Sequence, residues 1–66
     1  MNGQVSRLII NKGFGFIKGE DGKEYFVHRS AFPYGVVWEQ LREDQPVTFD
    51  VGMGEKGPRA ENVRLA

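Results

Sequence analysis

Glycine and proline divide this chain into segments that are too short for long helices. There are nine glycines and three prolines among its 66 residues. The segments between them have the composition of strands, and we predict five, over residues 3–10, 14–19, 24–28, 46–53 and 58–65. Val47, Phe49 and Val51 alternate with polar neighbours, which is the period of a half-buried strand. The predicted fold class is all-β. A small closed or nearly closed barrel is favoured, because a flat sheet of this size could not bury its apolar face.

The connections between these strands are predicted to be short, apart from one irregular segment. Residues 11–13 and 20–22, with the sequences NKG and EDG, have the composition of tight turns. Residues 52–58 are predicted to form a flexible connector between the last two strands. Residues 32–44 are irregular, and we expect one helical turn there, because Val37 and Leu41 are four apart.

The length and composition limit what kind of protein this can be. A chain this short makes one domain, to which we assign residues 1–66. The sequence has no cysteine and one histidine, which excludes disulfides, a thiolate metal site and a zinc site held by histidine alone. The apolar run near the N-terminus has only three residues, too few for a signal peptide or a membrane span. We therefore expect a cytoplasmic protein with no metal, cofactor or membrane partner.

Charge is distributed unevenly along the chain, although the formal net charge is zero. The first 19 residues carry three cations and no acid: Arg7, Lys12 and Lys18. Residues 39–50 carry four acids against Arg42 alone: Glu39, Glu43, Asp44 and Asp50. A neutral chain can thus present one basic and one acidic face, although either run by itself is also what an ordinary solvated surface contains.

Two registers are possible for the hairpin that joins residues 14–19 to residues 24–28. A two-residue loop would pair Phe16 with Val27, whereas a three-residue loop ending in a left-handed Gly22 would pair Phe16 with Phe26. The second register gathers one mixed set on one face: Phe14, Phe16, Lys18, Phe26 and His28. The other face then holds a largely apolar set: Gly15, Ile17, Tyr25 and Val27. Because the face with lysine and histidine is the wetter one, we predict the second register, with the three phenylalanines outside the core.

Three phenylalanines outside the core reduce the apolar surface that a domain this small can bury. Their position therefore indicates a function other than stability. Contiguous exposed apolar surface usually marks a binding site. Rings beside lysine and histidine suit single-stranded nucleic acid, because bases stack on the rings while phosphates attract the cations. The alternatives are that the rings cap an open end of the barrel or contact a partner protein.

The residues of this hairpin resemble the paired nucleic-acid-binding motifs of bacterial cold-shock proteins, in KGFGFI (12–17) followed by YFVHRSAF (25–32). The resemblance extends over nearly the whole chain, through NGQV (2–5), EDQPVTF (43–49) and GEKGPRAENV (54–63). It implies a five-stranded antiparallel OB-type barrel of the cold-shock domain type. It also implies binding of single-stranded RNA and DNA with low sequence specificity, as an RNA chaperone or a regulator of gene expression.

The resemblance also implies a role for particular residues. Phe14, Phe16, Phe26 and His28 would form the platform on which bases stack. Lys12 would contact a phosphate, while Gly13 and Gly15 would let the nucleic acid pass close to the chain. Lys56 and Pro58 match a loop that borders the binding face.

The chain departs from the family pattern at two positions that matter for binding. The first strand, which in the family usually reads G.VKWFN, has Arg7 where the tryptophan stands, and Arg29 follows His28 where an aromatic residue is usual. A guanidinium can stack on a base and also contact phosphate, so we include Arg7 and Arg29 in the predicted interface. The alternative is an ordinary surface ion pair, for example with Glu24. Val5 and Arg7 should share a face by parity, so we expect a bulge in the first strand.

Trp38 lies in the irregular segment, where the family has a loop aromatic, and two positions are open for it. It can stack on a base, and as such it is included among the predicted binding residues, or it can pack under the loop as part of the core.

An enzyme is not expected, because the chain has one histidine, no cysteine and no recognisable pair of carboxylates. The competing function is a protein–protein interaction module on the same barrel with weakened nucleic-acid binding, in line with the neutral net charge and the acidic segment. We expect a monomer, with a strand-swapped dimer as the alternative for a small barrel with open edges.

Overall fold

The computed structural model describes residues 1–55 and 57–66, and these residues form five strands. The strands are β1 (Asn2–Ile9), β2 (Phe14–Gly19), β3 (Glu24–His28), β4 (Pro46–Gly54) and β5 (Gly57–Leu65). Three short 3₁₀ turns connect them: η1 (Ile10–Lys12), η2 (Arg29–Ala31) and η3 (Trp38–Gln40). Each strand lies within one residue of its predicted bounds, and η3 falls inside the region where one helical turn was expected. Within the described residues, no helix is long and apolar enough to cross a membrane.

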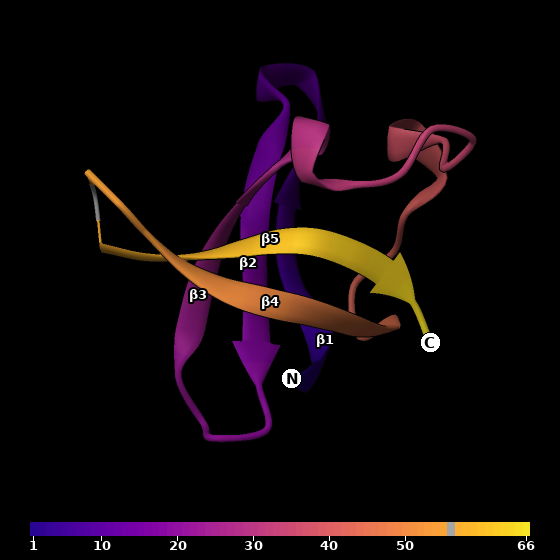
Figure 1. The fold of residues 1–66 in the computed structure, drawn as a ribbon. Helices are drawn as coiled ribbons and strands as arrows, with labels where there is room; N and C mark the ends of the chain where they lie inside the picture. The colour runs from indigo at the N-terminus through magenta and orange to yellow at the C-terminus, as the bar shows by residue number, and fades with distance from the viewer. Residues whose placement is uncertain (56) are drawn as a thin grey trace.

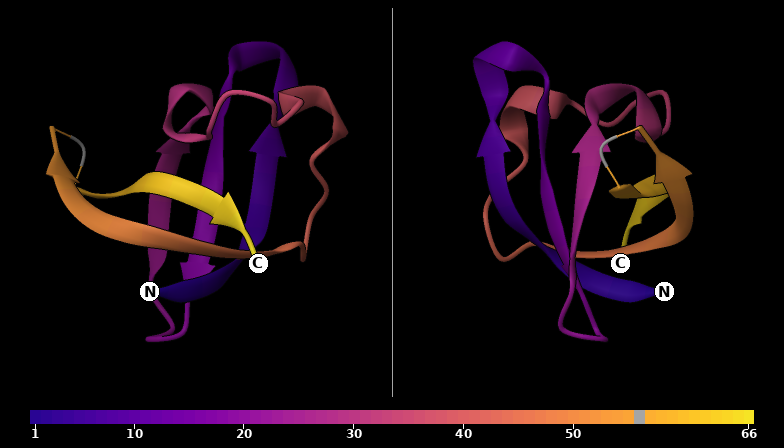
Figure 2. Two further views of the ribbon diagram at one scale, coloured as in Figure 1. Left: turned by 45° about the vertical axis from the view of Figure 1, so that its right-hand side comes forward. Right: turned by 90° about the vertical axis from the view of Figure 1, so that its left-hand side faces the viewer.

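The strands close into a barrel in the order β1-β2-β3-β5-β4, with β4 returning to pair with β1. Figures 1 and 2 show β1, β2 and β3 side by side, with β4 and β5 crossing them at a steep angle. Neighbouring strands are antiparallel except β3 and β5, which are parallel through the pair Phe26–Arg59. The predicted all-β, five-stranded OB-type barrel is confirmed, with one parallel junction in a barrel that is otherwise antiparallel. The reason is arithmetic: strand directions cannot alternate all the way around a closed ring with an odd number of strands.

The core fills the inside of this barrel with residues from every strand. Its buried members are Val5, Ile17, Tyr25, Val27, Val47, Phe49, Ala60 and Val63. Leu8, Ala31 and Phe32 are partly buried and pack against it. Burial alternates along β2 and β3, so Ile17, Tyr25 and Val27 face inward, as predicted.

The β2–β3 hairpin adopts the second of the two registers considered above. Gly19 N donates to Lys23 O at 2.8 Å, which closes a three-residue loop. Gly22 has φ of 81°, the left-handed conformation that this turn needs. Phe16 is consequently opposite Phe26, and Phe14 is opposite His28. Both the register and the outward placement of the phenylalanines are confirmed.

Strand β1 contains the bulge that parity required. Val5 pairs with Ile17 and Arg7 pairs with Phe16, so one extra residue is inserted on β1 between these pairs. Val5 is fully buried, whereas Arg7 is exposed. The bulge thus brings Arg7 onto the outer face beside Phe16, although Val5 two residues earlier belongs to the core.

The β2–β3 loop contains a hydrogen bond that should make stability depend on acidity. Tyr25 Oη donates to Asp21 Oδ2 at 2.5 Å, and Lys23 N donates to Asp21 Oδ1 at 3.0 Å. These bonds, that from Tyr25 first, hold the pKa of the Asp21 carboxyl below its ordinary value of 3.8. Because the pKa is lower in the folded chain, the ionised carboxylate stabilises the fold above about pH 4, and this contribution is lost as pH falls through the folded pKa.

We expect Asp21→Asn to remove this part of the acid dependence. The measurement is urea unfolding of the parent and the variant from pH 2 to pH 7, with the difference in free energy of unfolding plotted against pH. The difference should be largest near neutrality and shrink as pH falls below about 4. A difference that stays constant across this range would show that Asp21 is ionised equally easily in the folded and unfolded chains.

Candidate nucleic-acid interface

Three phenylalanines of β2 and β3 form a cluster on the outer face of the barrel. The Phe14 and Phe26 rings are stacked, with centroids 5.6 Å apart and an interplanar angle of 28°. Phe16 meets both rings edge-on, with its centroid 6.4 Å from that of Phe14 and 6.0 Å from that of Phe26. All three are half-buried and lie outside the core cluster. The rings therefore hold one another in place while part of each remains accessible to a ligand; we call Phe14, Phe16 and Phe26 the aromatic platform.

The two glycines beside the platform serve the protein's own backbone. A Cβ at Gly15 would lie 2.4 Å from Arg7 O, so the absence of a side chain lets β1 approach β2. Gly13 has φ of 76° and ends η1 in the left-handed conformation. Gly15 is buried against β1, which corrects the prediction that it makes room for the nucleic acid. Its role is to let the strand that carries Arg7 lie next to the platform.

The predicted cations Arg7, Lys12 and Arg29 are all exposed, and they come from three different elements. Arg7 is next to Phe16 across the β1–β2 pair. Arg29 N donates to Gly13 O at 2.9 Å, which ties the start of η2 to the end of η1, where Lys12 lies. Within residues 1–55 and 57–66, the ion pair that forms is between Arg59 and Glu61, so neither predicted arginine pairs with Glu24. Glu24 instead accepts a hydrogen bond from Ser6 Oγ at 2.8 Å.

His28 lies at the end of β3, directly opposite Phe14. Its Nδ1 accepts a hydrogen bond from Ser30 N at 3.1 Å and is 2.9 Å from Ser30 Oγ. A backbone N–H can only donate, so Nδ1 carries a lone pair and the proton of the neutral ring is on Nε2. The side chain is exposed and fixed in orientation, which leaves an Nε2–H donor beside the platform.

Trp38 is packed under the 32–44 loop and is not exposed for stacking on a base. Its ring is only 6% exposed, its indole Nε1 donates to Ile10 O at 3.1 Å, and it packs against Phe32 with ring centroids 5.6 Å apart. Phe32 in turn packs against the core. This corrects the prediction of Trp38 as a base-stacking ring. A small barrel gains more from burying this large ring under the 32–44 loop, where its N–H finds a carbonyl, than from leaving it in water. Tyr34 is the exposed aromatic of the loop.

Lys56 and Arg59 are two further cations to consider for this interface. Lys56, predicted to contact the nucleic acid, lies outside the described residues. Arg59 of β5 is next to Phe26 across the parallel junction, and the sequence reasoning missed it. The sequence could indicate only that Arg59 faces outward, because it is next to Ala60, an apolar inward residue of this strand; it could not indicate the contact with Phe26.

The fold and this surface together define a class: OB-type β-barrel proteins that present an aromatic and cationic face on an outer sheet. A family profile described as "'Cold-shock' DNA-binding domain" matches residues 1–66. The chain belongs to the cold-shock domain family, as the sequence motifs implied. Members of this family are nucleic-acid-binding proteins and not enzymes.

Three relatives indicate how closely the chain follows the family. It is 48% identical over 63 residues to cold shock protein 2 of Lactiplantibacillus plantarum, covering 96% of this chain and 94% of the relative. It is 46% identical over 63 residues to the cold shock-like protein CspC of Bacillus cereus, covering 96% of this chain and 95% of the relative. It is 44% identical over 62 residues to the cold shock protein CspD of Bacillus subtilis, covering 94% of this chain and 92% of the relative.

Proposed function

We propose that this protein binds single-stranded RNA and DNA with low sequence specificity, by stacking bases on the aromatic platform and contacting phosphates with its cations. The observation that carries the proposal is the cluster of Phe14, Phe16 and Phe26, half-buried on an outer face while the core is complete without it. Every base offers a π-face to such rings. A role as RNA chaperone or regulator of gene expression would follow from this binding.

The platform favours single strands over duplexes. Bases in a duplex are already stacked and paired, so they cannot lie on the platform without being separated. We further propose that the protein acts as a cytoplasmic monomer. Closure of the described strands into a barrel supports the monomer over a strand-swapped dimer, because it pairs the edges that a second copy would use.

The experiment that tests this function is a titration of a labelled single-stranded heptanucleotide, in RNA and DNA, with a duplex of equal length as the control. We expect the single strands to bind and the duplex to bind far more weakly. A protein that only binds other proteins would bind neither form at any salt concentration. That result would favour the protein–protein interaction module instead.

Salt dependence tests the cations separately from the rings. If Arg7, Lys12, Arg29 and Lys56 each neutralise one phosphate, the slope of log affinity against log salt should be about −0.7 per contact, or near −3 in all. Arg29→Phe should flatten the slope by roughly 0.7, while the introduced ring replaces the planar guanidinium as a stacking surface. The measurement is fluorescence anisotropy from low to high salt. An unchanged slope in the variant would show that Arg29 does not contact the backbone of the nucleic acid.

A further inference from the structure

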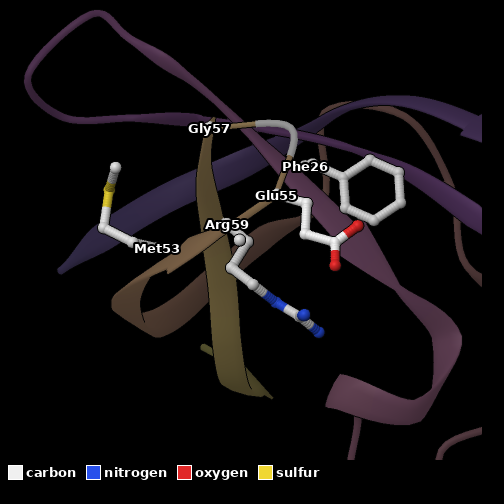
Figure 3. Close-up of a pocket in the computed structure, with 6 residues that line it drawn as sticks. Phe26, Met53, Glu55, Gly57 and Arg59 are labelled. Carbon is white, nitrogen blue, oxygen red and sulfur yellow. The ribbon is translucent and has the colours of Figure 1, made fainter.

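A pocket of about 390 Å³ adjoins the aromatic platform at the β4–β5 hairpin. Phe26, Met53, Gly54, Glu55, Gly57 and Arg59 line it. Phe26 belongs to both the platform and the pocket, so a strand bound on the platform passes the mouth of the pocket. Figure 3 shows the Glu55 and Arg59 side chains extending to the side of the hairpin on which Phe26 lies, while Met53 extends the other way. The volume is in the range of small-ligand sites, about 300–1,000 Å³.

Two glycines of β4 hold the Arg59 side chain in position. A Cβ at Gly54 would lie 3.0 Å from Arg59 Cδ, so the aliphatic part of Arg59 packs on Gly54. A Cβ at Gly52 would lie 2.5 Å from the carboxyl carbon of Glu61, so Glu61 occupies the neighbouring space. Glu61 Oε2 is 3.7 Å from Arg59 Nε, close enough to attract the guanidinium but too far for a hydrogen bond. Gly54 thus packs against the aliphatic part of Arg59, and the Glu61 carboxylate lies beside its Nε.

The described part of the chain leaves the hydrogen-bonding groups of this pocket without partners. Within residues 1–55 and 57–66, the Arg59 guanidinium has no hydrogen-bond partner, and its Nε is buried. Glu55 likewise has no hydrogen bond or ion pair with the described side chains, and it is exposed. The pocket therefore offers a planar set of donors from Arg59 and a pair of acceptor oxygens from Glu55 next to an aromatic ring.

Among residues 1–55 and 57–66, the charged groups at this pocket favour a base over a phosphate. One guanidinium is accompanied by two carboxylates, Glu55 in the pocket and Glu61 behind the arginine. A phosphate placed at Arg59 would meet the repulsion of both of these anions. A base is neutral and has donors and acceptors on its edges, so it can use Arg59 and Glu55 together.

Guanine is the base whose edges match this pair of side chains. Its O6 and N7 are adjacent acceptors, which the fork of an arginine contacts with two parallel hydrogen bonds. Its N1–H and N2–H₂ are adjacent donors, which suit the two oxygens of a carboxylate. Adenine and uracil have neither of these paired edges, and cytosine lacks the pair of donors.

We propose that the pocket of Phe26, Glu55 and Arg59 binds one guanine of the single strand held on the platform, with Arg59 at O6 and N7 and Glu55 at N1 and N2. This inference rests on the proposed function, and it adds one specific position to binding that is otherwise tolerant of sequence. The strand would then bind in one register, with guanine at the end of the platform nearest the β4–β5 hairpin.

The test is a series of labelled heptathymidines in which a single guanine is moved along the strand. We expect guanine at one position to raise the affinity about 5- to 150-fold over thymine, adenine or cytosine there. Replacing that guanine by 7-deazaguanine removes N7, and replacing it by inosine removes the N2 amine. Each should lose part of the gain in the parent protein.

Matched variants assign these losses to the two side chains. In Arg59→Lys the charge is kept and the fork is lost, so the 7-deazaguanine penalty should disappear. In Arg59→Gln the charge is removed, and the salt slope should still stay unchanged because Arg59 contacts a neutral base and not a phosphate. In Glu55→Gln the inosine penalty should disappear. Arg64→Lys, at an exposed position of the same strand, is the control and should retain both penalties.

Four results would overturn the proposal. Equal affinity for all heptamers would leave single-strand binding intact and remove the guanine site. A guanine preference that persists unchanged in Arg59→Lys and Glu55→Gln would place the site elsewhere. A flatter salt slope in Arg59→Gln would make Arg59 a phosphate contact. Failure of every heptamer to bind would overturn the proposed function and this inference together.

Discussion

Alanine at both Phe16 and Phe26 is expected to abolish most single-strand binding and leave the protein folded. Stacking of a base on an aromatic ring contributes roughly 1–3 kcal/mol, so loss of two rings should weaken binding by about 30-fold to 10⁴-fold. Each single variant should lose about 5- to 150-fold. The fold should persist because both rings are half-buried on the outer face and the core cluster does not include them.

The measurement pairs an oligonucleotide titration with urea unfolding of the same variants. Ile17→Ala is the matched control, because Ile17 follows Phe16 on β2 and its side chain is fully buried on the opposite face. It should cost about 2–5 kcal/mol of stability through the cavity it leaves, and weaken binding only in proportion to the unfolded fraction. If Phe26→Ala unfolded the chain while Ile17→Ala left it stable, the assignment of the two faces would be inverted.

The part of the interface that could be predicted from the sequence is the part set by strand parity. Once Gly22 fixes a three-residue loop, Phe14, Phe16 and Phe26 must share a face, because laterally paired residues lie on the same side of a sheet. The bulge in β1 followed in the same way, since Val5 is apolar and Arg7 charged at positions that a regular strand would put on one face. Both inferences need only neighbouring strands, and the structure confirms both.

The remainder depends on strands that are far apart in the sequence. Arg59 meets Phe26 at the parallel junction of β3 and β5. An odd number of strands in a closed ring requires such a junction but does not determine where it falls. No local pattern in either segment indicates that contact. The room for its side chain also depends on Gly52 and Gly54 of another strand. The pocket beside the platform is therefore a property of the closed barrel and could not be derived from the hairpin motifs.

The position of Trp38 could not be predicted for a different reason. The sequence was compatible with stacking on a base and with burial under the loop, and the family resemblance favoured stacking, which the structure does not show. An aromatic residue in a loop is equally compatible with stacking on a ligand and with burial. What decides is whether its N–H finds a partner inside, and Ile10 O, 28 residues earlier, provides one. That partner appears only once η1 and the 32–44 loop lie at the same end of the barrel, as Figures 1 and 2 show.

Trp38→Ala is accordingly expected to lower stability by about 3–5 kcal/mol, the usual cost of deleting a large buried ring. A domain of this length has a total stability on the order of 3–10 kcal/mol, so the variant should be largely unfolded or melt at a much lower temperature. The loss combines the contact with Phe32, the hydrogen bond to Ile10 O and the cover over the end of the core. Thermal and urea unfolding followed by circular dichroism measure it.

Trp38→Phe separates this structural role from a contact with nucleic acid. The smaller ring can keep the packing against Phe32 but loses the indole donor, so we expect a milder loss, with about 1 kcal/mol from the hydrogen bond. Because the ring is buried away from water, affinity for a single-stranded heptamer should stay the same, and the tryptophan emission of the parent should change little when the heptamer binds. A variant that unfolds like the parent but binds the heptamer several-fold more weakly would instead show that the ring reaches the bases, which requires the 32–44 loop to open on binding.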